Sequence, residues 1–594
     1  MKKSSKKSKG PLWNLALLYK SADDPQIEKD MAELGSLFKA FADKYDTADK
    51  RYLHDEDELS RALTDFEKMS AKFDAKPLLY FHFLRDIEAS NEEASAKTAL
   101  FSNRIAKYDN MIAFFMVSLG TIPQDRQKQL ISSVKLAHFK VFLSRVFSDA
   151  QHMLSIAEEK IMNLKSQPAY EMWISGNEKM LNMKSVPWKG KGIPLAEALN
   201  AVRQLSRAAD RAKLAGAIAE ALKTVAPLSE AEINAVVIDK KINDELRGFK
   251  KPYESTIRRY RNDPKVVERL VDTVTGDFHI SHRFYKLKAK LLKLKQLGYQ
   301  DRAAKIGKIK IEFPFTKSVS VFSDILMKLD PKLADIFKSY VSKGQIDAPP
   351  RIGKRGGAYC AGTYENPTFV LLNHTDDLHS FTTLAHEMGH AFHGELSRLQ
   401  GPIYSDYSTA LAETASTLFE SIALDEIIER LPDKEKAIVL HDKINDDIAT
   451  IFRQVACFNF EKEIHETVRT KGFMSKEELA ELHNKHMKAY LGPVFKMKTD
   501  DGYYFVHWSH LRRFFYVYSY AYGMLVSKAL LRRYRADRSF WRSIERFLSA
   551  GGKASPEEIL LEIGIDVSKP GFFEEGLKEI EEDIVRLEKL TGKK

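Results

Sequence analysis

Apolar residues recur at helical spacing along most of this 594-residue chain, and that periodicity limits the possible folds more than any other feature. Residues 28–45, 195–222 and 573–590 are clear amphipathic stretches. Segments with proline or glycine separate such stretches, at 185–195, 224–230, 312–318 and 347–357. No Gly/Ser linker, low-complexity tract or fixed-period repeat divides the chain. We therefore predict a mainly α fold in one large body, with an N-terminal helical region at 11–200 and a second region at 201–594.

The N-terminus is basic. Lys and Arg (93) exceed Asp and Glu (82) by 11, and five of the lysines lie in residues 1–10, MKKSSKKSKG. We expect a disordered, solubilising tail there, with contact to nucleic acid or a membrane surface as the alternative. The chain shows neither a secretory signal nor a stretch of 18 apolar residues, so we predict no membrane span. Cys360 and Cys457 are the only cysteines, which favours a reducing cytoplasm over a disulfide framework.

Residues 283–299 carry many lysines, and two interpretations are open. The stretch could bind nucleic acid. It also reads as an amphipathic helix with Leu287, Leu291 and Leu294 inward and its lysines outward. We favour the helix, so nucleic acid is not an expected partner.

The stretch LAHEMGH (384–390) contains the pattern H-E-x-x-H. Residues four apart lie one turn apart on the same helix face, so His386 and His390 can both bind one zinc ion at about 2 Å. Glu387 stands beside that face, where it can act as general base on a zinc-bound water. With 17 histidines in the chain, the pattern arises by chance in about 4% of such sequences. The motif therefore favours a zinc hydrolase but needs support from the rest of the chain.

We expect the helix with this motif to span 376–400, because Thr375 or Asp376 can cap it and Gly401-Pro402 ends it. At about 100° per residue, its apolar residues form one stripe: Phe381, Ala385, Met388, Phe392, Leu396 and Leu399. Four histidines fall roughly opposite: His379, His386, His390 and His393. This arrangement predicts core on one side of the helix and a polar cavity on the other.

A hydrolytic zinc site needs a third protein ligand. The pattern H-E-x-x-H-x-x-G-x-x-H is excluded, because the chain has His393 where glycine is required and Leu396 where histidine is required. A second helix, at 408–431, offers Glu413 and Glu420 among apolar neighbours and with no cation four residues onward. Such carboxylates are rarely buried unless they are paired or bound to metal. We assign Glu413 to the metal and Glu420 to orienting a ligand, with a solvated glutamate as the alternative for each.

The distribution of charge supports a bound cation. From Gly356 to Glu429, 74 residues, the only Lys or Arg is Arg398, whereas the chain average of 93 in 594 predicts about 12. The same window holds 11 acidic residues. A basic protein that excludes cations from one region is expected to bind a cation there.

These residues resemble the thimet oligopeptidase and oligoendopeptidase F family of zinc metallopeptidases, most closely over about 350–525. The likeness rests on KRGGAYCAG, FVLLNHT, LAHEMGHAFHGEL, LAETASTLFE and HWSHLRRFFYVYSYAYG, and the opening PLWNLALLY is also similar. The resemblance implies a prolate helical body, a deep channel with a small β-sheet near one zinc ion, and short unfolded peptides as substrates. The family's ligand positions fall on His386, His390 and Glu413, and its catalytic glutamate on Glu387.

The resemblance also implies site residues in the segment 501–523, where ten of 23 residues are aromatic. His510 matches a family histidine, and Tyr518 matches a tyrosine that holds the oxyanion. Tyr516 is a further substrate-binding candidate. Arg512 stands where the family often has tyrosine, and it could instead meet a substrate carboxylate. The alternative for this segment is aromatic core.

Residues 355–359, RGGAY, resemble the family's edge strand along the channel. There the backbone of Gly357 and Ala358 could pair with an extended peptide, and a simple turn is the alternative. The apolar run 368–373 is consistent with a small buried strand.

The sequence thus predicts a cytoplasmic zinc endopeptidase that acts on oligopeptides. A zinc carboxypeptidase would instead need a cation for the substrate's C-terminus, and Arg512 or Arg513 is the candidate. A non-catalytic protein that binds peptides or nucleic acid and retains a relict site is the third reading. The sequence gives no oligomeric state.

Overall fold

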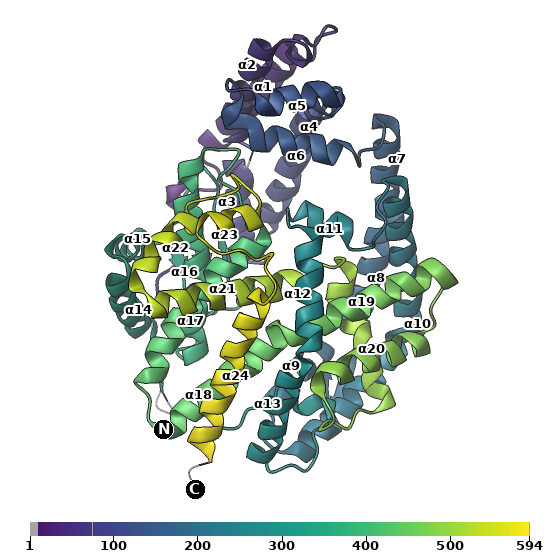
Figure 1. Cartoon of the computed structure of the whole chain (residues 1–594), viewed down its shortest axis with the longest axis vertical. Helices are drawn as coiled ribbons and strands as arrows, with labels where there is room; N and C mark the ends of the chain where they lie inside the picture. Colours follow the sequence, from purple (N-terminus) through teal and green to yellow (C-terminus); the bar gives the residue numbers. More distant parts are fainter. Residues whose placement is uncertain (1–9, 74, 310, 593–594) are drawn as a thin grey trace.

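The computed structural model describes residues 10–73, 75–309 and 311–592, and these are mainly helical, as predicted (Figure 1). The basic tail predicted at 1–10 lies, except for Gly10, outside the described residues. The helices of the N-terminal part are α1 (Gln26–Tyr45), α2 (Glu56–Ser70), α3 (Lys76–Ile87), α4 (Glu92–Gly120), α5 (Gln124–Ser132), α6 (Lys140–Ala150), α7 (Ile156–Ser166) and α8 (Met172–Asn182). In Figure 1, α1, α2 and α4–α6 form the upper end of the elongated molecule.

The remaining helices build the larger lower part (Figure 1). They are α9 (Leu195–Gln204), α10 (Ala208–Leu246), α11 (Glu254–Arg259), α12 (Pro264–Gly276), α13 (Phe278–Leu291), α14 (Phe315–Leu329), α15 (Pro331–Lys343), α16 (Leu378–Ser397), α17 (Thr409–Glu429), α18 (Asp433–Thr450), α19 (Phe452–Lys471), α20 (Lys476–Leu491), α21 (Tyr518–Ala536), α22 (Trp541–Leu548), α23 (Pro556–Glu562) and α24 (Phe572–Thr591). No helix of the described residues is both long and apolar enough to cross a membrane.

Two small sheets complete the described structure. β1 (Ser185–Trp188) and β2 (Lys191–Pro194) form an antiparallel hairpin. The other sheet has the order β3 (Ile346–Asp347), β5 (Phe369–Leu371), β4 (Tyr359–Ala361), with β5 parallel to β3 and antiparallel to β4. β4 is therefore an edge strand with one neighbour in the sheet.

Two hydrophobic cores meet at β5. One contains residues from Trp13 to Phe147 together with Phe369 and Leu371, and the other runs from Val186 to Leu587. Alternate side chains of a strand point to opposite faces, so the intervening Val370 joins the second core. The cores divide the chain between residues 147 and 186, and the boundary that we placed at 200 stays a prediction.

Glycines bring three helices into close contact beside the candidate site. A Cβ on Gly389 of α16 would lie 2.7 Å from the Cα of Ser416 on α17. A Cβ on Gly523 of α21 would lie 2.8 Å from the Cβ of Glu413, also on α17. Because glycine has no Cβ, both helices approach α17 more closely than other residues would allow. The packing of α16, α17 and α21 therefore determines where the side chains of α17 lie.

The helix with the H-E-x-x-H motif differs in detail from the prediction. α16 begins two residues later, because Asp377 is its cap and accepts a hydrogen bond from the backbone N–H of Ser380 at 2.8 Å. It ends at Ser397, before a short 3₁₀ turn. Leu399, which we assigned to the core stripe, is 74% exposed. His393, which we assigned to the polar face, is fully buried, and its ring stacks on Tyr407 at 3.6 Å.

Two other local predictions were wrong. The break predicted at 224–230 does not end a helix, since α10 continues through Pro227. Val225, Ala226 and Ile233 are buried around it, so tertiary packing outweighs the local cost of proline. The second concerns the lysines of 283–299, which we predicted to point outward. Lys288 is instead buried, and its Nζ donates a hydrogen bond to the backbone oxygen of Arg302 at 2.7 Å.

Candidate functional site

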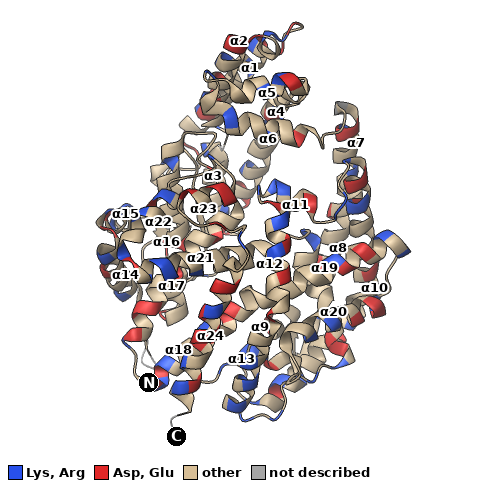
Figure 2. Cartoon of the chain, viewed as in Figure 1, with Lys and Arg blue, Asp and Glu red and all other residues tan. Residues whose placement is uncertain are grey.

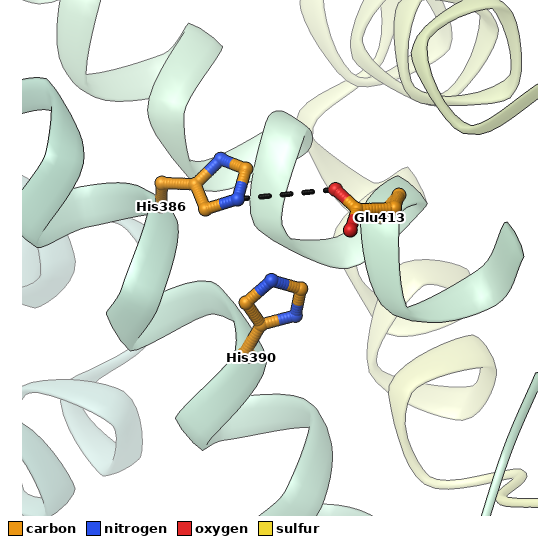
Figure 3. Close-up of side chains that lie close together, drawn as sticks. All are labelled: His386, His390 and Glu413. Carbon is orange, nitrogen blue, oxygen red and sulfur yellow. Dashed lines mark ion pairs between the residues drawn. The ribbon is translucent and has the colours of Figure 1, made fainter. Parts of the chain in front are cut away.

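Two helices bring together the three predicted metal ligands, His386, His390 and Glu413, which we call the metal triad (Figure 3). His386 and His390 lie one turn apart on α16, and Glu413 comes from the N-terminal part of α17. One potential ligand atom of each residue lies within 4.8 Å of the others, and His386 Nε2 is 3.9 Å from Glu413 Oε2. Two imidazoles and a carboxylate are donors that zinc accepts, and tetrahedral binding would place them about 3.4 Å apart. Small side-chain movements would therefore let this group hold a divalent ion.

Glu420 binds the ring nitrogen of His386 that does not face Glu413. Its Oε2 accepts a hydrogen bond from His386 Nδ1 at 2.9 Å, and Nε2 of the same ring faces Glu413. Burial alone would lower the pKa of His386, but the hydrogen bond and charge of Glu420 outweigh it and raise the pKa to about 9. A carboxylate in this position fixes the orientation of a metal-binding imidazole.

His390 has the opposite protonation preference. Burial and the neighbouring His386 lower the pKa of His390 to about 3, so its ring is neutral at pH 7 and has a lone pair available. Burial also raises the pKa of the Glu413 carboxyl. A cation among these residues would favour the charged form of the carboxylate.

Glu387 is only 6% exposed and yet lines the same cavity as the triad. Burial raises the pKa of its carboxyl to about 7; the charge of His386 lowers the pKa, and the nearby Glu413 raises it. A carboxyl that titrates near neutral pH can both accept and release a proton during turnover.

The triad lies in the wall of a cavity of about 1590 Å³. That volume exceeds the roughly 300–1,000 Å³ of small-molecule pockets and is large enough for a peptide. Elements from distant parts of the chain line it, including α6, α11, β4, α16 and the N-terminal part of α17. The cavity therefore depends on the whole fold.

The predicted edge strand lies along this cavity, slightly later than expected. Ala358 and all of β4, from Tyr359 to Ala361, line the cavity. Gly357 precedes the strand in a bend with φ of 79°, and its backbone oxygen accepts a hydrogen bond from Asn373 at 2.8 Å. The free edge of β4 is thus at 359–361 rather than at Gly357.

The structure does not bring Arg512 to the site. Its side chain is buried and forms a two-pronged ion pair with Glu232, at 2.9 and 2.6 Å. It also donates to the backbone oxygen of Trp508 at 3.0 Å. Breaking such a buried pair is strongly unfavourable, so Arg512 supports the segment and is not free to bind a substrate carboxylate.

Nor does the structure bring Tyr518 to the triad. Tyr518 is fully buried, and its hydroxyl donates to Asn262 Oδ1 at 2.9 Å. His510 is instead grouped with Tyr516, whose hydroxyl lies 2.5 Å from His510 Nδ1, and with Tyr520, whose ring centroid is 6.2 Å from that of His510. Tyr516 lies in the turn just before α21 and Tyr520 in the first turn of that helix, and the centroids of both rings lie within 6.2 Å of that of His510.

The sequence analysis singled out neither Tyr407 nor Tyr520. Tyr407 lines the cavity, stacks on His393 and reaches the backbone oxygen of His390 with its hydroxyl at 3.5 Å. It lies in a loop, where periodicity gives no signal. Tyr520 is one turn from Gly523, which contacts Glu413, but that contact is visible only in three dimensions.

Comparison with known proteins gives a consistent result. Residues 203–579 match the model of Peptidase family M3, and residues 119–184 match that of Oligopeptidase F. An Oligoendopeptidase F homolog from Lactococcus lactis is 24% identical over 98% of this chain and 97% of its own. Oligopeptidase PepF from Bacillus subtilis is 23% identical over 90% of this chain and 82% of its own.

Solved structures show the same fold. A chain from Chlamydophila abortus superposes with a TM-score of 0.83 at 22% identity, over 98% of each chain. Oligoendopeptidase-F from Enterococcus faecium superposes with a TM-score of 0.69 at 19% identity, over 97% of this chain and all of its own. The match to the M3 model covers more than half of the sequence. The chain therefore belongs to peptidase family M3, in its oligoendopeptidase F branch.

Proposed function

We propose that this protein is a zinc-dependent endopeptidase that hydrolyses internal bonds of short, unfolded oligopeptides. The convergence of His386, His390 and Glu413 beside Glu387, in one peptide-sized cavity, carries the proposal. Two neutral-capable imidazoles and one carboxylate leave an open fourth position, as in catalytic rather than structural zinc sites. When bound there, zinc would act as a Lewis acid on the scissile carbonyl and on the attacking water.

Glu387 supplies the proton transfers in this proposal. Its carboxylate takes the proton from the attacking water as the new C–O bond forms, and its carboxyl then gives that proton to the leaving amine as the C–N bond breaks. Its position beside His386 and its pKa of about 7 suit both steps. Glu420 keeps His386 oriented throughout, through the hydrogen bond to Nδ1.

The group of His510, Tyr516 and Tyr520 is proposed to meet the oxyanion that develops on the carbonyl. The three side chains are half-buried, and Tyr520 is one helical turn from the contact between Gly523 and Glu413. Preorganised donors at a developing oxyanion contribute about 3–4 kcal/mol. We move the role that the sequence gave to Tyr518 to Tyr520, because Tyr518 donates to Asn262 instead.

Substrate binding is proposed to use backbone pairing as well as the cavity wall. β4 is an edge strand that lines the cavity, so an extended peptide can add as its second neighbour. Backbone pairing is tolerant of side chains, which suits a peptidase of oligopeptides. A carboxypeptidase would need Arg512 or Arg513 to bind the substrate's C-terminus; Arg512 is buried, and Arg513 is exposed.

One experiment tests the core of the proposal. Metal content and hydrolysis of a quenched fluorescent peptide are measured for the wild type and for Glu387→Ala. We expect both proteins to hold about one zinc ion and only the wild type to turn over. Equal activity of both proteins would refute the role of Glu387. Cleavage of an internal bond in a C-terminally amidated peptide separates endopeptidase from carboxypeptidase activity.

A further inference from the structure

A basic loop occupies another part of the same cavity wall. Arg258 and Arg259 are the last residues of α11, and Arg261 lies in the connection to α12. All three are exposed and line the cavity that contains the metal triad. Figure 2 shows the cationic residues of this segment in blue at α11. Three arginines in four positions thus face the space in which a substrate would lie.

These arginines are largely free of acidic partners. Arg258 pairs with Glu254 at 3.0 Å, whereas in the described part of the chain no carboxylate forms an ion pair with Arg259 or Arg261. Asp149 on α6 also lines the cavity and interacts with Arg258 and Arg261. Glu254 and Asp149 carry two negative charges against the three positive charges of Arg258, Arg259 and Arg261, so this part of the wall keeps a net positive charge.

A second group extends the basic surface. Arg145 on α6 lines the cavity too, and it donates to the backbone oxygens of Gly552 and Ala554 rather than to a carboxylate. Burial and the charge of Arg261 lower the pKa of Arg145 to about 10, so it remains charged at pH 7. Arg145 and Arg261 therefore contribute to the same positive potential.

The loop is held in a conformation that residues other than glycine rarely adopt. Arg261 has φ of 63°, in the left-handed region, which is unfavourable for a residue with a side chain. Its neighbour Asn262 is fixed on both sides: it accepts from the Tyr518 hydroxyl at 2.9 Å and donates to Glu557 at 3.0 Å. Tyr518, which does not face the triad, thus fixes the loop that presents Arg261 to the cavity. Strain that the surroundings maintain in this way is typical of functional sites.

We infer that Arg258, Arg259 and Arg261 form a carboxylate-binding wall and that this protein prefers acidic oligopeptides. The inference rests on the proposed peptidase function and names the substrate class for it. Guanidinium groups bind carboxylates through two parallel hydrogen bonds. Arginines without an ion-pair partner in a concave site, here Arg259 and Arg261 among the described residues, attract anions before contact. The carboxylate can come from an Asp or Glu side chain or from the peptide's C-terminus, and the experiment distinguishes the two sources.

The test uses four quenched peptides of one length and one neutral scissile region. On each side of the scissile bond, one position carries Glu, Gln or Lys. The Gln peptide is made in two forms, one with a free and one with an amidated C-terminus, which gives four peptides. We expect kcat/KM to be about tenfold higher for the Glu peptide than for the Gln peptide if the arginines bind acidic side chains of the substrate. A similar gain for the free over the amidated end would identify the C-terminus as the source. Either gain should shrink at high salt.

Variants link the preference to the loop. Arg258→Gln/Arg261→Gln is expected to remove the preference, mainly through KM, while cleavage of the amidated Gln peptide changes less than about twofold. The charge reversal Arg258→Glu/Arg261→Glu should favour the Lys peptide. Arg542→Gln, an exposed arginine on α22 outside this cavity wall, is the matched control and should keep the wild-type preference.

The outcomes separate this inference from the proposed function. A wild type that cleaves the Glu, Gln and Lys peptides equally, and both ends equally, refutes the basic wall but leaves the peptidase intact. Equal loss on all peptides in the arginine variants, with an unchanged melting temperature, also refutes it. A wild type that holds zinc and cleaves none of the peptides refutes the proposed function itself.

Discussion

Glu387→Gln is expected to abolish turnover and, at the same time, to make the metal-free protein more stable. Glu387 is 6% exposed, and burial raises the pKa of its carboxyl from 4.5 to about 7. At about 1.4 kcal/mol per pKa unit, an ionised Glu387 destabilises the metal-free fold by about 3 kcal/mol above pH 7. Glutamine keeps nearly the same shape without a charge, so the substitution removes this cost.

The sign of the pH dependence follows from the raised pKa of Glu387. Below about pH 4, the carboxyl is protonated in both folded and unfolded chains, and the variant gains nothing. As the pH rises from 4.5 to about 7, the unfolded chain ionises first, so the wild type loses stability relative to the variant. Above pH 7 the folded chain ionises too, and the difference stays constant.

Thermal unfolding of chelator-treated protein at pH 4 and pH 8 measures this difference. For a cooperative unit of 594 residues, about 3 kcal/mol corresponds to a rise in Tm of about 2 °C. We expect that rise at pH 8, none at pH 4, and a smaller one in zinc-loaded protein, because a cation stabilises the Glu387 carboxylate. Glu582→Gln, on the exposed surface of α24, is the control and should leave Tm unchanged. A fall in Tm at pH 8, or the same shift at both pH values, would refute the reasoning.

Four further substitutions test other parts of the site. Glu420→Gln should weaken zinc affinity about 10- to 100-fold in a chelator competition, because His386 loses the carboxylate that orients it; unchanged affinity would contradict this role. Gly389→Ala should destabilise the protein by about 1–3 kcal/mol, since the new Cβ meets α17 at 2.7 Å; an unchanged Tm would show that the helices separate freely. Tyr520→Phe should lower kcat about 100-fold and Tyr518→Phe less than about threefold; the reverse order in steady-state kinetics would return the oxyanion role to Tyr518.

The grouping of His386, His390 and Glu413 was accessible from sequence because it is encoded at short range. His386 and His390 are one turn apart on one helix, and Glu413 lies on the next helix among apolar neighbours. The absence of Lys and Arg around them is also a property of contiguous sequence. Local patterns of this kind gave α16, α17 and the strand β5 nearly in full.

Roles that depend on distant partners could not be predicted. The partner that buries Arg512 is Glu232, which lies 280 positions away. Tyr518 and Tyr520 are two residues apart in an aromatic run, and only their partners in the fold distinguish them: Tyr518 donates to Asn262, whereas the ring of Tyr520 lies 6.2 Å from that of His510. The run of arginines at 258–261 was visible in the sequence, but nothing local connects it with a cavity that α16 also lines.

The separation of charge within the cavity explains both the cation-poor window and the basic loop. A free arginine beside Glu413 would pair with its carboxylate and compete with a metal ion for it. Arg398, the only cation in the window, is bound to Glu395 at 2.7 Å and to backbone oxygens of 363–366, so it is not free to do so. Arg259 and Arg261 belong to a different element of the wall and form no ion pairs in the described chain. One cavity can then hold a cation on α16 and α17 and attract anionic peptides at α11, because in the described chain the arginines at α11 form no ion pair with the glutamates of the metal site.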